Sequence, residues 1–537
     1  MSITRYPDFF NDVLGPVMQP GSSSHTAAPC RLGLLARNLL YAKPAEIQFI
    51  MDPDGSFAGT FGLMNEGNGM LAGVMNIKPD DARLFRAPEI ARQRDIRYRF
   101  LFEPVVESRH ANAVKIRLTA RDGHMAELTG ESTGGGMVHV SNIDGFRVDL
   151  YGDCYALLVF SSLTCAEKHE LKSTVSGLLA EEETQKTGGE RLYLLLCSER
   201  PVRAADILQG RHFSILAPVL PVVAKVSRRP QLFASISQWN QIARQRGIGM
   251  SETAILYEMN FSQLSRRQII VRMKRIMRLL IAQVEAAYQP DAEAGTPPFS
   301  RNDCAEWTEY QQREAALSGD PIAEIIRRVQ GVSAKIPGTP IVPGPMGTGG
   351  GYLFSALYSV AKQRGFREKD VLRGLFIAAG VGALAYTHTQ PTGEVVGCAG
   401  ECGVCCAMGA AAIVEMAGGS GEQIGHAASL ALQAFIGLPC DPVPGGREAP
   451  CFSRVLAAAV MAVVYADIAL SGATTDLTYE DMLHAIDRVG KSMPPELLCT
   501  SKGGCCDTPS GRACMARFWE WSGAGHEDRP NIPGAYK

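Results

Sequence analysis

The stretch from Thr392 to Cys451 constrains the fold most, because it sets three cysteines into loops between apolar segments. Cys398, Cys440 and Cys451 each follow a glycine or a proline. A thiolate held on such a loop can point toward a shared centre without breaking the hydrophobic core of the flanking helices. Three thiolates, with no fourth in a matching loop, predict a metal centre that keeps one coordination position open. The alternative for each cysteine is an ordinary buried thiol.

The composition is typical of a globular protein. The 537 residues, 46% apolar and 20% charged, predict two to four domains. A net charge of −2 argues against nucleic acid and against an anionic membrane surface as partners. The two most apolar stretches, 371–388 and 452–471, contain charged residues, so we expect buried helices and no membrane span.

Cysteine usage indicates the compartment. The chain has 15 cysteines, an odd number concentrated after residue 397, and its first residues lack the apolar core of a signal peptide. Disulfides are not expected in a reducing compartment, so metal binding or redox chemistry is the better interpretation. We therefore expect a cytoplasmic protein.

The pattern of apolar runs predicts an α+β protein with three parts. Residues 1–145 alternate short apolar runs with turns, as in a mixed α/β domain. Residues 146–203 show strand, helix and strand patterns typical of a small βα module. Residues 204–537 have mostly helical patterns, including a capping box in which Gln423 follows Ser420 by three positions.

Two polar or glycine-rich stretches precede predicted helices. The run Ser22–Thr26 leads into a helix near Pro29, where hydroxyls and unpaired N–H groups suit a carboxylate or phosphate. A plain N-cap in a serine-rich turn is the alternative. The glycines of residues 343–351 indicate either a second backbone anion cradle or only a tight helix entry.

Motifs along the chain resemble the iron–sulfur L-serine dehydratases of bacteria, in the form with both parts fused in one chain. The resemblance covers about residues 11–510. The matching segments are Gly15–Thr26, Gly55–Ala58, Pro79–Arg83, His110–Asn112, Thr133–Gly136, Ile143–Phe146, Gly397–Glu401, Gly437–Val443, Pro450–Cys451 and Thr500–Gly504. The spacings between the three cysteines, 42 and then 11 residues, also fit this family.

The resemblance implies a 4Fe–4S cluster held by Cys398, Cys440 and Cys451, and no pyridoxal phosphate. Such a cluster leaves one iron open, which can act as a Lewis acid toward the β-hydroxyl leaving group. β-Elimination of water from L-serine, followed by hydrolysis of the enamine, gives pyruvate and ammonia. The module at 146–203 lies where the family has an ACT-like domain.

The resemblance and the polar patterns together give candidate site residues. For catalysis they are His25, Glu401 and Lys502. For substrate binding they are Ser22, Ser23, Ser24, Thr26, His110, Asn112, Gly349 and Gly350. Each has a structural alternative, such as a hydrogen-bonded core histidine, a charge at a helix start or a turn cap. None of them identifies the group that removes the α-proton.

Departures from the family pattern leave the substrate open. Asn65 and Glu66 stand where the family has a Gly-His-Gly-Thr-Asp segment. Alternatives are therefore an L-cysteine desulfidase, a dehydratase of a larger β-hydroxy amino acid, or, from another class, a non-catalytic cluster-bearing sensor. Further cysteines, which either pack around the cluster or form a second site, stand at positions 402, 405, 406, 505, 506 and 514. We expect a small amino acid as partner, no nucleic acid, no membrane, and a homodimer.

Overall fold

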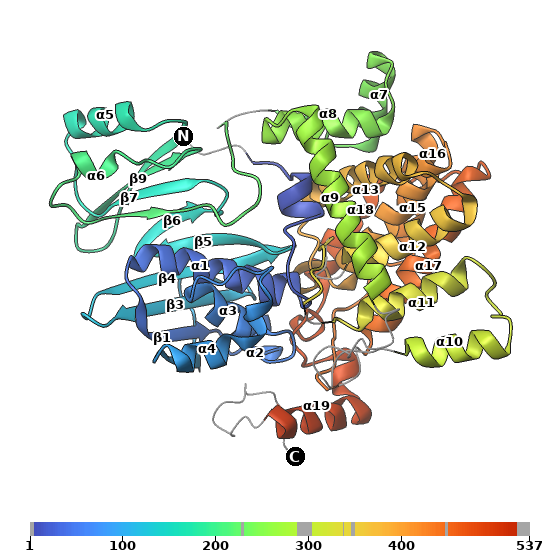
Figure 1. Ribbon diagram of the computed structural model, residues 1–537, viewed down its shortest axis with the longest axis horizontal. Coiled ribbons are helices and arrows are strands. Elements are labelled where there is room, and N and C mark those ends of the chain that lie inside the picture. Colours follow the sequence, from blue (N-terminus) through green and yellow to red (C-terminus); the bar gives the residue numbers. More distant parts are fainter. Residues whose placement is uncertain are drawn as a thin grey trace.

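The computed structural model describes residues 5–226, 230–286, 303–336, 338–344, 349–445 and 449–522. Two β-sheets with their covering helices form one half of the molecule, and helices alone form the other (Figure 1). This arrangement confirms the predicted mixed α/β content with a mostly helical C-terminal part.

The strands are β1 Pro44–Met51, β2 Arg97–Phe102, β3 Ala113–Ala120, β4 Met125–Gly134, β5 Met137–Ile143, β6 Phe146–Leu150, β7 Tyr155–Val159, β8 Leu178–Gln185, β9 Arg191–Cys197 and β10 Phe213–Leu216. The α-helices are α1 Ala28–Leu40, α2 Ser56–Gly59, α3 Glu66–Val74, α4 Ala87–Gln93, α5 Cys165–Thr174, α6 Ala204–Ile207, α7 Ile236–Arg246, α8 Met250–Ser262, α9 Arg266–Glu285, α10 Cys304–Arg313, α11 Ile322–Ser333, α12 Gly349–Arg364, α13 Glu368–His388, α14 Gly393–Val396, α15 Val404–Met416, α16 Gly421–Gln433, α17 Cys451–Leu470, α18 Tyr479–Ser492 and α19 Pro509–Ser522. Short π and 3₁₀ turns are η1 Phe9–Val13, η2 Ser23–Ala27, η3 Ala82–Arg86, η5 Ala399–Gly403, η6 Pro495–Leu497 and η7 Gly504–Asp507.

The first sheet has six strands in the order β2-β1-β3-β4-β5-β6. β1 and β2 are parallel, and the other neighbours are antiparallel. Helix α1 packs on this sheet and against α3. A Cβ on Gly73 would lie 2.0 Å from Cys30 O, so the glycine allows the two helices to approach each other closely.

The second sheet has four antiparallel strands in the order β10-β7-β9-β8. Its edge strand β10 lies beyond residue 203, where we placed the end of the small module. Strand β6, which we expected in this module, pairs with β5 in the first sheet. The reason is the turn at Asp144 and Gly145, where both residues have positive φ and join β5 to β6 as a tight hairpin.

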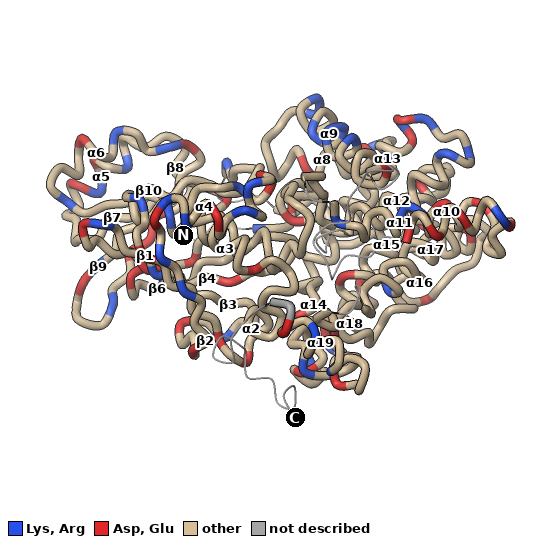
Figure 2. The backbone as a smooth tube through the Cα atoms, turned by 60° about the horizontal axis from the view of Figure 1, so that its bottom comes forward, with Lys and Arg blue, Asp and Glu red and all other residues tan. Residues whose placement is uncertain are grey.

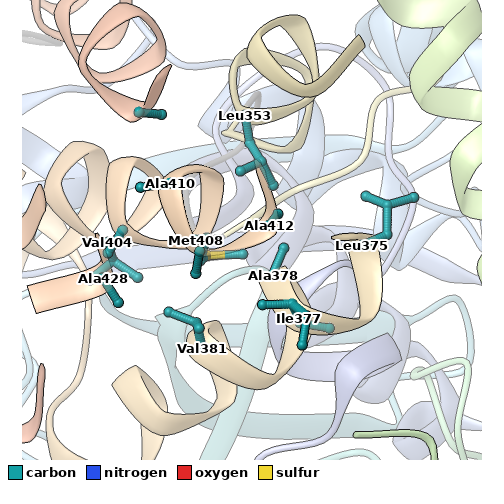
Figure 3. Packing of buried hydrophobic residues seen from close by; sticks show 14 of the residues in the cluster. Leu353, Leu375, Ile377, Ala378, Val381, Val404, Met408, Ala410, Ala412 and Ala428 are labelled. Carbon is teal, nitrogen blue, oxygen red and sulfur yellow. The ribbon is translucent and has the colours of Figure 1, made fainter. Parts of the chain in front are cut away.

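The helical half is organised around α13 and α15, with α12, α16 and α17 packed beside α15. Figure 3 shows alanines and branched apolar side chains of these helices meeting in one buried cluster. A Cβ on Gly409 would lie 2.9 Å from Cβ of Ala462, so the glycine sets the spacing of α15 and α17. The capping box of Ser420 and Gln423 is present and begins α16, as predicted.

By length and composition alone, three described helical stretches could cross a membrane: Glu368–His388, Ala399–Met416 and Cys451–Leu470. Of their most apolar windows, 72%, 89% and 33% are buried inside the protein. The first two are therefore core helices, whereas α17 keeps much of its apolar surface partly exposed. Charged residues are spread along the backbone of both halves of the molecule (Figure 2).

The turn η1, which comes first in the described chain, packs into the helical half, because it inserts Phe9 and Phe10 into the helical core. Buried carboxyl groups accept hydrogen bonds from the backbone N–H groups of η1. Glu258 Oε2 lies 2.9 Å from Phe9 N, and Asp8 Oδ1 lies 2.8 Å from Phe10 N. Burial raises the pKa of Glu258 to about 8, and the negative charge of Asp12 also acts to raise it. The folded protein therefore holds this carboxyl group in its neutral form over a wide pH range.

Replacing Glu258 with glutamine should stabilise the protein at pH 8 and change its stability little at pH 5. The folded-state pKa of about 8 lies above the ordinary 4.5, so between these values the unfolded chain releases a proton that the folded protein keeps. Stability therefore falls as the pH rises through this window. Glutamine does not titrate, so it removes a loss on the order of 2–4 kcal/mol at pH 8.

Thermal unfolding at pH 5 and pH 8 measures this effect. The matched control is Glu252→Gln, on the same helix α8, where the carboxylate is partly exposed and paired with Arg266. The prediction would be contradicted if both variants gained the same stability. It would also be contradicted if the stability gained by Glu258→Gln did not increase between pH 5 and pH 8.

Candidate active site

The imidazole of His25 lies at the contact between the two halves of the molecule. It belongs to η2, a π-helix that continues into α1 and begins after the N-cap Ser22. Its Nδ1 lies 3.2 Å from Ser22 Oγ and 3.5 Å from Glu394 Oε1. Its Nε2 lies 3.0 Å from Ser56 Oγ in α2. His25 is only 1% exposed, so protein groups rather than water determine its protonation.

The charges around His25 favour its protonated form. Burial by itself lowers the pKa of His25, but a hydrogen bond with the Cys499 thiol and the negative charges of Cys499, Glu394 and Glu66 raise it to about 9. Burial acts to raise the pKa of Glu394, but His25 and neighbouring hydrogen bonds produce a net lowering. At neutral pH the two side chains therefore form a buried imidazolium–carboxylate pair.

Polar atoms without partners surround Glu394. The side chains of Thr392 and of Asn112, which precedes β3, lie against its carboxylate and help to lower its pKa. Among the described residues, Asn112 Oδ1, Thr392 Oγ1 and Glu394 Oε2 are buried without a hydrogen-bond partner. Buried acceptors without a partner are energetically costly, so these three indicate a place for the donor groups of a ligand.

The turn Gly134–Gly136 brings the first sheet against this site. All three glycines have positive φ. A Cβ on Gly134 would lie 2.1 Å from a side-chain carbon of Thr392, and one on Gly135 would lie 2.5 Å from the Tyr386 hydroxyl. The glycines therefore allow the two halves to pack closely beside Glu394.

The three predicted ligand thiols lie on the helical side of the site. Cys398 precedes η5, Cys440 follows α16, and Cys451 begins α17. Cys398 and Cys440 are 4% and 8% exposed, and they interact electrostatically. A Cβ on Gly393 would lie 2.5 Å from Cys440 Sγ, so the glycine leaves space at this thiol.

Arg454, which the sequence analysis did not single out, connects the thiol loops. Its Nη1 donates to Pro439 O at 2.7 Å and to Asp441 Oδ1 at 2.6 Å. Burial acts to lower the pKa of Arg454, but Asp441 and the thiolate forms of Cys398 and Cys451 raise it overall. A fixed cation beside these sulfurs stabilises the thiolate form that metal binding requires.

The donor set fits an iron–sulfur cluster, because cysteine thiolates are the usual ligands of such clusters. Thiolates that bind different irons of a cluster come from separate directions. Space at Cys440 and the nearby guanidinium of Arg454 complete the fit.

Cys499 lies between His25 and Cys440, and the sequence analysis gave it no role. Its N–H donates to Cys440 O at 2.7 Å, and its carbonyl accepts from Ser56 Oγ at 2.6 Å. Donor atoms of Cys499, His25 and Glu394 lie within 4.8 Å of one another. A hydrogen bond with Cys440 and, against the effect of burial, a second one with His25 lower the pKa of Cys499 to about 6.

Most other predicted residues surround this site. Ser23 and Ser24 are buried beside His25 in η2, and Thr26 Oγ1 donates to Met64 O. His110 Nδ1 accepts from the N–H of Asn112 at 3.0 Å. Burial, together with the negative charges of Cys398 and Glu394, raises the pKa of Glu401 well above its ordinary value. Glu401 therefore lies close to the thiols in its neutral form.

Lys502 and the two glycines of α12 have other contacts. Lys502 Nζ pairs with Asp54 Oδ1 at 2.9 Å and joins the C-terminal segment to the first domain. A Cβ on Gly350 would lie 2.4 Å from Val342 O, and Gly349 beside it is buried. Residues 345–348 of the predicted anion cradle lie outside the described residues.

The additional cysteines divide into two groups. Cys402 Sγ lies 3.1 Å from Cys398 Sγ and therefore packs beside the predicted centre. Cys405 Sγ donates to Gly344 O at 2.6 Å. Cys406 is buried in α15. The second group comprises Cys505, Cys506 and Cys514. These cysteines form a small apolar cluster with Val443, Met515 and Phe518.

A buried histidine–carboxylate pair beside a thiol centre, enclosed between two domains, is the arrangement of an enzyme active site. The profile of the family described as serine dehydratase alpha chain matches residues 245–506. The probable L-serine dehydratase alpha chain of Bacillus subtilis is 30% identical over 286 residues, which are 52% of this chain and 93% of that protein. The chain belongs to the L-serine dehydratase family.

Two further relatives extend this similarity. The L-serine dehydratase beta chain of Peptoniphilus asaccharolyticus is 31% identical over 181 residues, 34% of this chain and 78% of that protein. L-serine dehydratase 1 of Escherichia coli is 37% identical over 137 residues, 25% of this chain and 30% of that protein. The chain is thus similar to both the alpha and the beta chains of relatives in which these are separate proteins.

Proposed function

We propose that this protein deaminates L-serine to pyruvate and ammonia, with a 4Fe–4S cluster held by Cys398, Cys440 and Cys451. The observation that carries the proposal is the buried pair of His25 and Glu394 beside these thiols. The substrate named for the relatives supports L-serine as the amino acid.

The acceptors around Glu394 suit the ammonium group of an amino acid. An ammonium group has three N–H donors and no acceptor. Asn112 Oδ1, Thr392 Oγ1 and Glu394 Oε2 are three buried acceptor atoms without partners among the described residues. One of them belongs to a carboxylate, which also balances the positive charge of the ligand.

The N-terminus of the helix formed by η2 and α1 suits the carboxylate group of the substrate. Ser22 caps this helix, and Ser23 and Ser24 are buried in its first turn beside His25. Helix N-termini direct N–H groups and a partial positive charge toward an anion. We assign these three serines to carboxylate binding.

His25 supplies the proton for the leaving hydroxyl group. When bound, the cluster provides Lewis acidity at this hydroxyl. The raised pKa keeps His25 protonated at neutral pH, and Glu394 fixes the ring through Nδ1. Removal of the α-proton, together with departure of the protonated hydroxyl group as water, converts L-serine into an enamine, which tautomerises and hydrolyses to pyruvate and ammonia.

Three other predicted residues have supporting positions in this proposal. Glu401, neutral through burial, places a carboxyl oxygen near Gly393 and the cluster ligands. His110 Nε2 lies 3.2 Å from Gln390 Nε2, and this contact fixes the segment that leads to Thr392. Lys502 holds the C-terminal segment in place through Asp54.

Glu66 shapes the site instead of selecting the substrate. Its carboxylate accepts from Thr60 Oγ1 and from the N–H of Gly62, both at 2.9 Å. It thereby fixes the loop whose Met64 carbonyl binds Thr26. The departure from the family pattern at this loop therefore does not require a substrate other than L-serine.

The remaining assignments belong to the same proposal. The strand–helix–strand–strand–helix–strand order from β7 to β10 supports an ACT-like module. Similarity to both alpha and beta chains supports a fused form of the two-part enzyme. The partly exposed apolar surface of α17 supports a homodimer. Composition and cysteine usage support a cytoplasmic enzyme.

A substrate panel on anaerobically reconstituted protein tests the proposal. We expect kcat/KM for L-serine, measured as pyruvate release, to exceed the values for L-threonine, L-cysteine, D-serine and larger β-hydroxy amino acids. A preference for L-cysteine with sulfide release would instead indicate a desulfidase. Absence of turnover with every β-substituted amino acid, in protein with a full cluster, would indicate a sensor.

A further inference from the structure

Arg31 is a buried cation whose guanidinium group is only partly paired. It lies in the first turn of α1 and is 2% exposed. Among the described residues, its Nη1 donates to Gly136 O at 2.8 Å, and its Nε has no hydrogen-bond partner. Burial lowers the pKa of Arg31 to about 10, so the group stays charged at neutral pH. A carbonyl oxygen does not neutralise this charge, and an unpaired N–H group in the interior is costly, so Arg31 indicates the place of an anion.

The hydroxyl group of Tyr386 is a second buried donor without a partner. Tyr386 belongs to α13, and among the described residues its Oη is buried and makes no hydrogen bond. Burial, reinforced by the negative charges of Asp12 and of nearby acidic groups, raises the pKa of Tyr386 well above its ordinary value. The hydroxyl group therefore stays protonated at neutral pH and can donate a hydrogen bond.

The glycine turn Gly134–Gly136 brings these two donors to one place. A Cβ on Gly135 would lie 2.5 Å from Tyr386 Oη, and one on Gly136 would lie 2.7 Å from Arg31 Nη1. The first glycine of the turn lies against Thr392, whose hydroxyl group we assign to the ammonium group of the substrate. One unpaired acceptor and two unpaired donors therefore follow one another along this turn.

We propose that Arg31 and Tyr386 bind the carboxylate group of the substrate. This inference rests on the proposed function, in which Thr392 and Glu394 take the ammonium group. The two charged groups of an α-amino acid are bonded to the same carbon, so their binding groups must lie side by side, as they do along the turn. A site built to pair with a carboxylate discriminates strongly against its absence, so the enzyme takes free α-amino acids and rejects their amides and esters.

The direction of the Arg31 side chain agrees with the serines already assigned to this carboxylate. A Cβ on Gly136 would also lie 3.6 Å from Cβ of Ala27, which precedes Arg31 by one helical turn. The guanidinium group therefore extends back toward the helix start that carries Ser22–Ser24. A carboxylate accepts about four hydrogen bonds, so it has room for donors from both sides.

Glycine and glycinamide test this site, because neither has a β-leaving group and only glycine has a carboxylate. Their dissociation constants are measured by titration calorimetry on anaerobically reconstituted enzyme. We expect wild type to bind glycine at least about 100-fold more tightly than glycinamide, and Arg31→Gln to bind the two within about tenfold of each other. An unchanged ratio in Arg31→Gln, or no preference in wild type, would overturn the proposal, because a merely structural arginine does not distinguish a carboxylate from an amide.

Tyr386→Phe keeps the site testable if Arg31→Gln does not fold. Among the described residues the removed hydroxyl group has no partner, so the midpoint of thermal unfolding without ligand should equal that of wild type. The dissociation constant of glycine should rise about tenfold. The matched control is Tyr193→Phe, a buried tyrosine of β9 whose hydroxyl group donates to Glu181, and it should bind glycine like wild type. Glycine binding by Tyr386→Phe that equals wild type would overturn the proposal.

Pyruvate release and glycine binding separate this site from the proposed function. Wild type that prefers glycine over glycinamide but releases no pyruvate from L-serine would overturn the proposed function and leave the carboxylate site intact. Turnover of L-serine by wild type, with glycine binding that neither variant changes, would overturn the carboxylate site alone.

Discussion

Serine in place of Cys440 is expected to remove the iron–sulfur chromophore and to lower pyruvate formation at least about 1,000-fold. A serine hydroxyl is a poor replacement for a thiolate ligand, and Cys440 is buried beside Gly393. The same result is expected for Cys398→Ser and Cys451→Ser. Iron and sulfide analysis of anaerobic protein measures it, with about four of each per wild-type chain.

The matched control is Cys406→Ala, which removes another buried thiol from the same half of the molecule. Cys406 lies in the first turn of α15 at 1% exposure, and among the described residues its thiol makes no hydrogen bond to the three loops of the predicted ligands. This variant should retain its iron. A full cluster in all three serine variants would refute the ligand assignment.

Alanine in place of His25 should lower kcat/KM for L-serine by at least about 100-fold, which is the range for a lost acid–base group. Iron content should not change, because His25 is not one of the three cluster ligands. The control is His212→Gln, a histidine that directly precedes β10 of the second sheet and stacks on Phe160. Activity of His25→Ala within a few-fold of wild type would make His25 a structural residue.

The pH profile of Glu394→Gln separates positioning of His25 from a general loss of folding. The negative charge of Glu394 is one of the causes that raise the pKa of His25. Removing this charge lowers that pKa, so the protonated form of His25 is lost at a lower pH. The alkaline limb of kcat/KM should therefore move to lower pH while iron content stays at the wild-type level. If the alkaline limb of Glu394→Gln lay at the same pH as in wild type, the pairing of Glu394 with His25 would be contradicted.

Local patterns predicted much of the helical half. The apolar stretch 371–388 lies within α13, and Ser420 begins α16 through its capping box, because both signals act within a few residues of one another. Strand β8 was missed because it is an edge strand rich in glutamate, whose carboxylates pair with Lys168 and Lys172 of α5. Its antiparallel pairing with β9 and these ion pairs involve residues outside the strand, which a local pattern does not contain.

The site was predicted in part for a related reason. His25 and the three predicted ligand cysteines stand in distinctive segments, and the family resemblance singled them out as candidates. Glu394 and Cys499 become recognisable only when folding brings residues from three distant parts of the chain within 4.8 Å. Glu394 follows Gly393 at the start of the cysteine-rich stretch, and Cys499 directly precedes the Thr-Ser-Lys-Gly-Gly motif. Their positions beside these motifs were the signals available in the sequence.

The dependence of L-serine turnover on cluster content tests the central claim most directly. Iron-free protein is reconstituted anaerobically to several levels of iron and sulfide, and the rate of pyruvate release from L-serine is measured at each level. We predict a rate proportional to the fraction of chains with a full cluster and no turnover without iron. Turnover of L-serine by iron-free protein, or none by fully loaded protein, would contradict the account.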